Sequence, residues 1–308
     1  MKKILLLTFI IILIPFTIVN FFKVDQKEEI KLNYESNTII RVKRMASGEI
    51  VGVPFEQYIV GVLAGEMPIY FNLEALKAQA VAARSYALKR MEYNKDNDFD
   101  VVDSILNQVY LDDGYLKDAW GDDYVDNINK LREAVNATSM EYLDYNGDVI
   151  DALFFSTSNG YTETSSLVFN IDLPYLQSVS SSWDEKTSSA FKSTTSMSLR
   201  DFYSKLNIDY SDYFDVKILE KSSTNRIIKL SINGKEFLGR DLYNILGLKS
   251  TDFSLKKDGD KVIINTIGYG HGVGMSQYGA EGMAEEGYSY IDILKHYYVG
   301  TNIKKIEN

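Results

Sequence analysis

Three turn dipeptides constrain the fold of this 308-residue chain more than any other feature. Each is flanked on both sides by runs rich in β-branched and aromatic residues, and they are Asn146-Gly147, Asn233-Gly234 and Asp258-Gly259. Such dipeptides reverse the chain directly between antiparallel strands, because both positions tolerate a positive φ. A further turn at Ser47-Gly48 separates two strand-like runs within residues 38–54. The chain is therefore expected to contain several antiparallel hairpins.

Helical segments alternate with these hairpins. Residues 55–64 and 72–93 predict two helices, with Asn72 as the N-cap of the second. This second helix carries a narrow face of small residues for close packing, namely Ala75, Ala78 and Ala82. The composition, 45% hydrophobic, is sufficient to bury a large core. The pattern predicts an α+β fold, in which one domain over residues 38–308 packs helices on antiparallel strands and hairpins.

The N-terminal residues include an apolar run long enough to cross a membrane. Residues 4–22 are uncharged and match the thickness of a hydrocarbon core. Lys2 and Lys3 precede this run, so the positive-inside rule places the rest of the chain outside the cytoplasm. The absence of a small-residue cleavage site favours an uncleaved anchor over residues 1–22, with a cleaved signal peptide as the open alternative. The charged residues 23–37 predict a stalk between membrane and domain.

Charge and cysteine content narrow the classes of function. The net charge of −10 argues against nucleic acid as a partner, because neutralising phosphates requires a basic surface. A neutral or cationic ligand fits this composition better. The chain has no cysteine, which removes disulfides, thiolate metal sites and cysteine nucleophiles.

Glu66 is the first candidate catalytic residue. It follows an apolar helical run, and both the negative end of the helix dipole and apolar neighbours raise a carboxyl pKa. A carboxyl kept partly protonated near neutral pH suits a general acid. The alternative is a structural glutamate that is solvated or paired with a base such as Lys77 or Arg84.

Two further stretches are candidate parts of a binding site. Residues 268–282 contain four closely spaced glycines around His271, which allow the backbone to approach another surface closely. Residues 154–164 combine hydroxyl side chains with an Asn-Gly turn. This second stretch is expected either to line a sugar-binding groove or simply to solvate the end of a strand.

The sequence predicts no metal site and no cofactor. His271 and His296 are the only histidines, and they lack a suitably spaced carboxylate for zinc. Residues 96–107 fail as an EF-hand, because Val101 stands where a glycine is required and Asn107 where a glutamate is required. A serine-based triad is disfavoured, since the G-x-S-x-G motif is absent.

Three stretches together resemble the stage II sporulation protein D family. They are residues 62–88, residues 154–179 with the following SSWDE at 181–185, and residues 268–301. The three stretches occur in the order and spacing of the family, and the resemblance covers nearly the whole region from residue 39 to 301. The resemblance implies a membrane-anchored peptidoglycan lytic transglycosylase that acts while the mother cell engulfs the forespore.

The resemblance also implies roles for individual residues. Glu66 matches the catalytic glutamate of the family, which serves as acid and then as base without water as a nucleophile. The residues expected to line the cleft and position the substrate are Ser156, Ser158, Asn159, His271, Ser276 and Gln277. The substrate would be glycan strands freed of stem peptides, and the partners would be stage II sporulation proteins P and M.

Two points of the resemblance leave the function open. Some family members carry a zinc cluster in the segment that matches residues 100–114, whereas this chain has only Asp103, Gln108 and Tyr110 in that frame. Without zinc, packing alone is expected to hold this segment. The wider family also includes amidase enhancers, so a non-catalytic activator that binds the wall or stimulates an amidase is the alternative function.

Overall fold

The computed structural model describes residues 28–33 and 38–306. The predicted anchor, residues 1–22, lies outside the described residues. Within the described ranges, none of the helices has the length and apolar character needed to cross a membrane.

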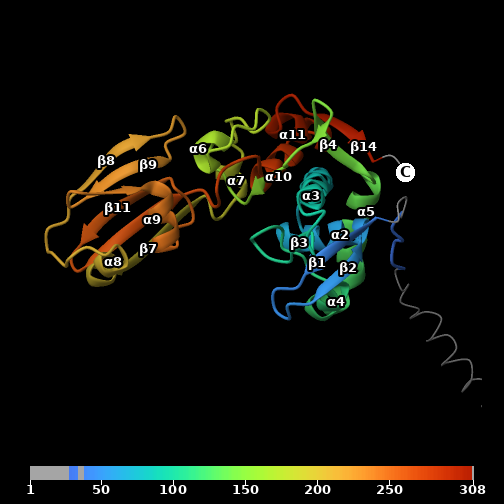
Figure 1. Cartoon of the computed structure of the whole chain (residues 1–308), viewed down its shortest axis with the longest axis horizontal. Helices are drawn as coiled ribbons and strands as arrows, with labels where there is room; N and C mark the ends of the chain where they lie inside the picture. Colours follow the sequence, from blue (N-terminus) through green and yellow to red (C-terminus); the bar gives the residue numbers. More distant parts are fainter. Residues whose placement is uncertain (1–27, 34–37, 307–308) are drawn as a thin grey trace, which may run out of the picture.

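The described chain has two separate hydrophobic cores, both of α+β character (Figure 1). The main core contains residues from both ends of the sequence, whereas the second core contains only residues between 199 and 264. We call residues 192–267 the second lobe and the remaining described residues the main lobe. Figure 1 shows the second lobe extending away from the helices of the main lobe. The predicted α+β fold is confirmed.

The main lobe contains eight α-helices and small sheets within the described residues. Its helices are α2 (Phe55–Glu66), α3 (Leu73–Tyr93), α4 (Asp113–Trp120), α5 (Tyr124–Ala137), α6 (Ser165–Phe169), α7 (Asp184–Thr187), α10 (Gln277–Glu285) and α11 (Tyr290–Tyr297), with a 3₁₀ turn at Gly121–Asp123. Its strands are β1 (Ile39–Lys43), β2 (Ile50–Pro54), β3 (Val101–Val102), β4 (Glu141–Tyr145), β5 (Asp148–Val149), β6 (Phe154–Phe155), β13 (Met275–Ser276) and β14 (Asn302–Lys305). The sheet orders are β2-β1-β3, β14-β4-β5 and β13-β6.

The second lobe consists of two three-stranded antiparallel sheets and two helices. Its elements are β7 (Lys192–Ser198), α8 (Leu199–Lys205), β8 (Val216–Lys221), β9 (Ile227–Ile232), β10 (Lys235–Leu238), α9 (Gly239–Leu246), β11 (Phe253–Asp258) and β12 (Lys261–Ile267). The sheet orders are β10-β9-β8 and β11-β12-β7. Both chain connections to the main lobe therefore come from one sheet, through the start of β7 and the end of β12.

Helix α3 is the centre of the main lobe. It packs against α2, α5, α10, α11 and β4. Its alanines, including Ala75, Ala78 and Ala82, are fully buried, and the residues between them are mostly buried as well. The expected narrow packing face is thus too limited a description, because small side chains let neighbours approach this helix from several directions. Asn72 caps its N-terminus as predicted, and its side chain accepts a hydrogen bond from the Glu74 N–H at 2.9 Å.

The predicted hairpins are present. Asn146 and Asn233 both have positive φ at the turns between β4 and β5 and between β9 and β10. At the third hairpin, Asp258 pairs with Lys261, so the turn is formed by residues 259 and 260, one position later than the dipeptide indicates. Two pairings are parallel, β1 with β3 and β13 with β6, which the predicted antiparallel arrangement did not include.

Contacts with the main lobe begin within the stretch that the sequence predicts as a stalk. Leu32 is buried in the main core. The Ile30 N–H donates to Oδ1 of Asn129 at 2.7 Å, and Glu29 forms an ion pair with Arg132 at 2.7 Å. Residues 28–33 therefore pack along α5, at least ten residues earlier than the predicted start of the domain at residue 38.

Candidate functional site

Glu66 is the last residue of α2, two residues beyond the predicted end of that helix. Its side chain is half-buried. The backbone N–H of Val109 donates a hydrogen bond to its Oε1 atom at 2.6 Å. One carboxyl oxygen is thus held in place by a segment more than forty residues away in sequence.

Two glycines of α2 explain why the Val109 segment lies so close. A Cβ atom at Gly65 would be 2.5 Å from the Val109 carbonyl oxygen, and one at Gly61 would be 2.4 Å from that of Leu111. The two glycines are four residues apart, so they lie on the same side of the helix. Their missing side chains admit residues 109–111 against α2, where the Leu111 N–H donates to the Gly61 carbonyl at 3.2 Å. This close approach places the Val109 N–H within hydrogen-bond distance of Glu66.

Burial raises the pKa of Glu66 above its ordinary value, because the charged form loses its hydration. The Val109 N–H and the side chain of Gln277 act in the opposite direction, since both favour the carboxylate. The position of Glu66 at the carboxyl end of α2 adds to the rise, because the helix dipole is negative there. The carboxyl therefore holds its proton to a higher pH than an exposed glutamate does.

The bases named as structural partners of Glu66 are paired with other carboxylates. Lys77 forms an ion pair with Glu74 at 2.6 Å. Arg84 is fully buried and donates to both carboxylate oxygens of Glu56, each at 2.8 Å. Within the described residues, no ion pair involves Glu66. The reading of Glu66 as half of a structural ion pair is therefore not supported.

Gln277 comes to Glu66 from the start of α10. The residue is 6% exposed, and its Nε2 faces Glu66 closely enough to favour the carboxylate but makes no hydrogen bond of ordinary geometry among the described residues. A buried amide donor without a partner is unusual in a folded protein. Gln277 is thus the one predicted substrate-positioning residue that the structure places beside Glu66 with a donor left over.

Aromatic side chains flank the same region. Tyr70 follows Glu66 by four residues and is 70% exposed, while Tyr278 follows Gln277. Their hydroxyl oxygens are 3.4 Å apart, and Phe71 packs edge-on against Tyr278 with ring centroids 5.0 Å apart. An exposed tyrosine four residues after a half-buried carboxyl suits a ligand that contains sugar rings.

Hydrogen bonds, in addition to packing, hold the segment that lacks the zinc ligands. Gln108 is fully buried, accepts from the Tyr58 hydroxyl at 3.1 Å and donates to the Ala83 carbonyl at 3.3 Å. Arg44 forms ion pairs with Asp103 at 3.0 Å and Asp112 at 2.7 Å. The expectation that packing alone holds this segment is therefore wrong. Polar contacts to α2, α3 and the end of β1 fix it beside Glu66.

Two of the predicted substrate-positioning serines are fully buried. Ser276 donates to Asp184, which also accepts from the Ser158 N–H at 2.7 Å. The Ser158 hydroxyl donates to the Ser181 carbonyl at 3.0 Å. These contacts hold the two loops together from within, so we assign Ser158 and Ser276 to the support of the site. Ser156 is only half-buried.

Asn159 and the glycine-rich loop lie where the two lobes meet. Asn159 donates from Nδ2 to the Thr224 carbonyl and to Asp252, both at 2.7 Å and both in the second lobe. The loop glycines at positions 268, 270, 272 and 274 all have positive φ. A Cβ atom at Gly274 would be 1.9 Å from the Leu153 carbonyl oxygen, which confirms the predicted close approach.

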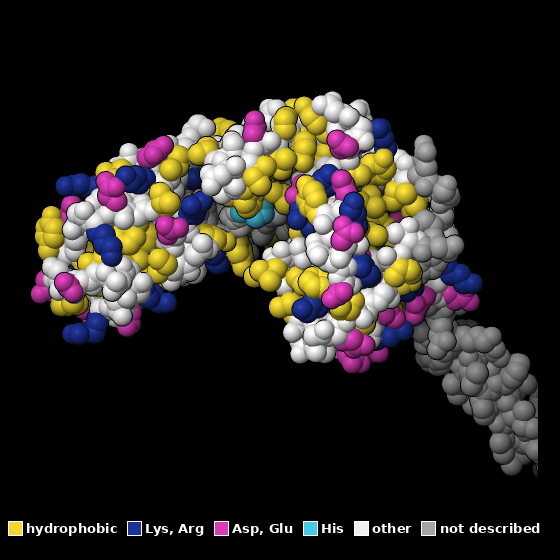
Figure 2. All heavy atoms as spheres, in the orientation of Figure 1, with side chains coloured by type: hydrophobic (Ala, Val, Ile, Leu, Met, Phe, Trp, Pro, Cys, Tyr) yellow, Lys and Arg dark blue, Asp and Glu magenta, His cyan; other side chains and the backbone are white. Residues whose placement is uncertain are grey.

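The two histidines contact different side chains. His271 packs between Phe155 and Phe169, with ring centroids 5.6 and 5.4 Å away, and burial lowers the pKa of His271 to about 4. The ring is therefore neutral at physiological pH, and its Nδ1 accepts from the Val273 N–H at 3.1 Å. His296 contacts the Ser180 carbonyl and the Trp183 ring instead. Figure 2 shows a histidine in the hollow between the two lobes.

Sequence reasoning missed Val109 and the two glycines of α2. Val109 acts through its backbone, so its side chain carries no signal of the role. The spacing of Gly61 and Gly65 was the available signal, because two glycines in successive turns of a buried helix indicate that another backbone approaches closely.

Comparisons with known proteins show which family the chain resembles. A family model described as stage II sporulation protein matches residues 44–145, which include Glu66 and Val109. Stage II sporulation protein D of Bacillus amyloliquefaciens is 41% identical over 279 residues, covering 89% of this chain and 81% of that protein. Its counterpart in Bacillus subtilis is 42% identical over 273 residues, covering 87% and 79%.

A more distant relative has a different name. The amidase enhancer of Bacillus subtilis is 33% identical, and the match covers 79% of this chain but 40% of that protein. The two stage II sporulation protein D sequences match across both lobes and are more similar to this chain. They confirm the resemblance found in the three sequence stretches, and the chain belongs to the stage II sporulation protein D family.

Proposed function

We propose that this protein is a peptidoglycan lytic transglycosylase in which Glu66 is the catalytic acid and base. The observation that carries the proposal is the half-buried Glu66 carboxyl, whose pKa is raised by burial and whose Oε1 is held by the Val109 N–H. A general acid needs such a proton near neutral pH.

The geometry supports different roles for the two carboxyl oxygens of Glu66. Because Oε1 accepts the Val109 hydrogen bond, the proton belongs on Oε2. Oε2 would protonate the glycosidic oxygen between N-acetylmuramic acid and N-acetylglucosamine. It would then accept the proton of the muramoyl 6-hydroxyl as that oxygen attacks the anomeric carbon, leaving a 1,6-anhydro end.

A single carboxyl suits this reaction. Hydrolytic glycosidases usually use two carboxylates, one of which activates water or forms the covalent intermediate. Burial, Val109 and Gln277 account for the pKa of Glu66, and no second carboxylate contributes to it among the described residues. An intramolecular nucleophile removes the need for a second carboxyl group. The exposed ring of Tyr70 and the spare amide of Gln277 would position the sugars.

The proposed setting is the membrane of the mother cell during engulfment. Residues 1–22 would anchor the protein, with the catalytic domain facing the intermembrane space. Stage II sporulation proteins P and M would be its partners, with P removing stem peptides before the glycan strand is cleaved.

The alternative function is a non-catalytic activator of an amidase. The observation in its favour is the match to the amidase enhancer of Bacillus subtilis over 79% of this chain. In this case Glu66 would be dispensable for the effect.

Mass spectrometry of digested glycan strands tests the proposal. The full chain in detergent micelles, its Glu66→Gln variant and, as a matched control, the exposed-site variant Glu49→Gln are incubated with peptide-free strands. We expect anhydro-muramoyl products from the native protein and from Glu49→Gln, and a loss of at least about a hundredfold with Glu66→Gln. Intact strands with all three proteins, together with amidase stimulation that survives Glu66→Gln, would establish the activator instead.

A further inference from the structure

A pocket lies between the lobes, and none of its lining residues belongs to the Glu66 site. Its volume is about 420 Å³, within the range typical of small-ligand sites. The main lobe contributes residues 163–170 and the loop at His271, while the second lobe contributes parts of β9 and α9. We propose that this pocket binds the C-terminal carboxylate of a short apolar peptide. The proposal does not depend on the function assigned to Glu66.

Arg226 provides the first cation of the pocket. Its side chain is buried, with the whole residue 4% exposed. Of its five N–H groups, one donates to the Tyr161 carbonyl at 3.1 Å and one makes a long contact of 3.4 Å with Ser250. Its Nε has no partner, and it forms no ion pair within the described residues. The charges of Glu163, Asp252 and Asp184 favour the charged guanidinium from beyond ion-pair distance, so its unused donors remain available to an anionic ligand.

The nearest acid of the pocket is already engaged. Glu163 accepts hydrogen bonds on both carboxylate oxygens, from the Thr164 N–H at 3.0 Å and from the Thr224 hydroxyl. It lowers the electrostatic cost of burying Arg226 but leaves the remaining guanidinium donors unused. The absent side chain of Gly272 makes room for the guanidinium itself, since a Cβ atom there would be 2.5 Å from Nη2.

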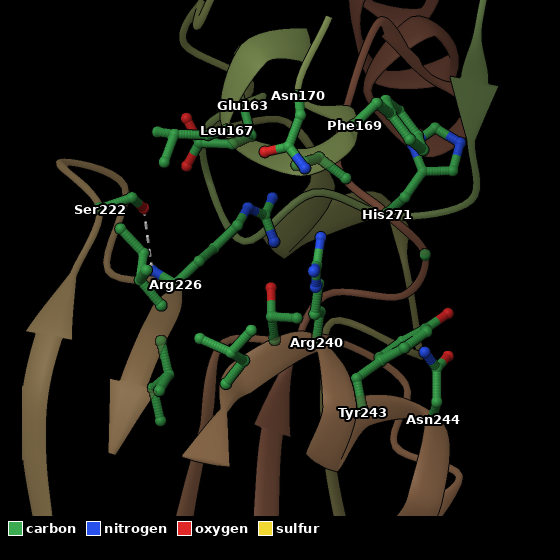
Figure 3. Close-up of a pocket in the computed structure, with 16 residues that line it drawn as sticks. Glu163, Leu167, Phe169, Asn170, Ser222, Arg226, Arg240, Tyr243, Asn244 and His271 are labelled. Atoms are coloured by element: carbon green, nitrogen blue, oxygen red, sulfur yellow. Dashed lines mark hydrogen bonds between the residues drawn. The ribbon is translucent and has the colours of Figure 1, made fainter. Parts of the chain in front are cut away.

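Arg240 provides a second cation at the pocket edge. It lies in the first turn of α9, its side chain is 58% exposed, and its closest acid, Asp241, is 3.8 Å away. Figure 3 shows Arg226 and Arg240 pointing into the same space, with the amide of Asn170 directed toward it from the opposite side. The lining thus contains two arginines and one glutamate in a chain whose net charge is −10.

The remaining wall of the pocket is suited to an apolar ligand rather than to an inorganic anion. It includes Leu167, Phe169 and Ile227, and the first two are 46% and 41% exposed. His271 is neutral at physiological pH and adds no charge. Phosphate would leave these apolar side chains uncovered, whereas a peptide would cover them. The amides of Asn170 and Asn244 match the donors and acceptors of a peptide backbone.

Calorimetric titration of the full chain in detergent micelles tests the proposal. The probes are N-acetyl-Leu-Ala with a free carboxylate, the same dipeptide as its C-terminal amide, and inorganic phosphate. We expect the acid to bind at least about tenfold more tightly than the amide, because only the acid forms charge-assisted hydrogen bonds with arginine. Phosphate at equal concentration should not displace it.

Variants assign the binding to the pocket. Arg240→Gln, at an exposed position, should weaken binding of the acid by about tenfold and leave the amide unchanged. Arg200→Gln is the matched control, since Arg200 is an exposed arginine of the second lobe outside the pocket. Glu66→Gln should bind the acid like the native protein, which separates this site from the proposed catalytic one.

Three results would overturn the proposal. Equal affinity for acid and amide would remove the role of the carboxylate. Displacement by phosphate would indicate a general anion site. No heat change with the acid up to about 10 mM would mean that the pocket does not bind such peptides.

Discussion

At the scale of single residues, the surroundings of Glu66 give its carboxyl a higher pKa than a glutamate ordinarily has. Its place at the end of α2 exposes it to the negative end of the helix dipole, and burial removes much of its water. The Val109 N–H then holds one oxygen without supplying a full countercharge. The carboxyl is thus fixed in position but remains easy to protonate.

This arrangement predicts a pH-dependent effect of Glu66→Gln on stability. A pKa raised by folding means that the native state binds the Glu66 proton more tightly than the unfolded chain does. The contribution of Glu66 to stability is then complete below its ordinary pKa and declines as pH rises through the raised value. The uncharged glutamine avoids this decline. The variant should therefore be more stable than the native protein at about pH 7, with the difference shrinking toward about pH 4.

Urea unfolding at the two pH values measures this difference. Glu49→Gln is the matched control, because Glu49 is exposed and its substitution should change the free energy of unfolding little at either pH. A Glu66→Gln effect of equal size and sign at both pH values would show that the substitution acts through shape or packing rather than through protonation.

At the scale of elements, the contact of α2 with residues 109–111 decides whether the site forms. This contact is possible because Gly61 and Gly65 have no side chains that would collide with residues 109–111. Gly65→Ala would place a methyl group 2.5 Å from the Val109 carbonyl oxygen, so one of the two backbones must move. Overpacking of this kind should lower the free energy of unfolding by about 2 kcal/mol.

The same substitution should also displace the Val109 N–H from Glu66. Urea unfolding measures the first effect, and the hydrogen-exchange protection of the Val109 amide measures the second. Gly114→Ala is the control, since Gly114 lies on the exposed side of α4 and alanine favours a helix by up to about 1 kcal/mol. Unchanged protection at Val109 in Gly65→Ala would show that the glycine does not set this contact.

The elements that could be predicted are those encoded by neighbouring residues. The hairpin at Asn233 and the N-cap at Asn72 follow from local turn and capping chemistry, and the structure contains both. The pairing of β6 with β13 could not be predicted, because it joins two-residue strands about 120 positions apart. The surroundings of Glu66 made it a candidate, and the family resemblance implied its catalytic role. Val109 was not, because the contact depends on tertiary packing and uses only the backbone.

At the scale of the whole molecule, the sequence did not reveal that one α+β chain builds two cores. The second core is built only from residues 199–264, inserted between two halves of the main lobe. The joint includes the two hydrogen bonds of Asn159 to Thr224 and Asp252. Burial raises the pKa of Asp252, and the Asn159 hydrogen bond acts against this rise. Asn159 therefore stabilises the charged form of a carboxylate in the second lobe.

Removing the Asn159 hydrogen bonds between the lobes should allow the two cores to unfold separately. Asn159→Ala deletes a hydrogen bond to a charged group and should destabilise the second lobe by about 2 kcal/mol. The chain contains its own probe, because its two tryptophans, Trp120 and Trp183, both pack against the main core. Tryptophan fluorescence thus reports on the main lobe, while far-ultraviolet circular dichroism reports on both lobes.

In urea, the variant should show a circular dichroism transition whose onset comes about 1 M before the fluorescence transition, given a typical dependence on denaturant. The native protein should show a smaller gap between the two probes. Asn265→Ala is the control, because Asn265 is exposed on β12 and contacts only the second lobe in its hydrogen bond with Thr194. If both probes shift together in Asn159→Ala, the two cores unfold as one unit.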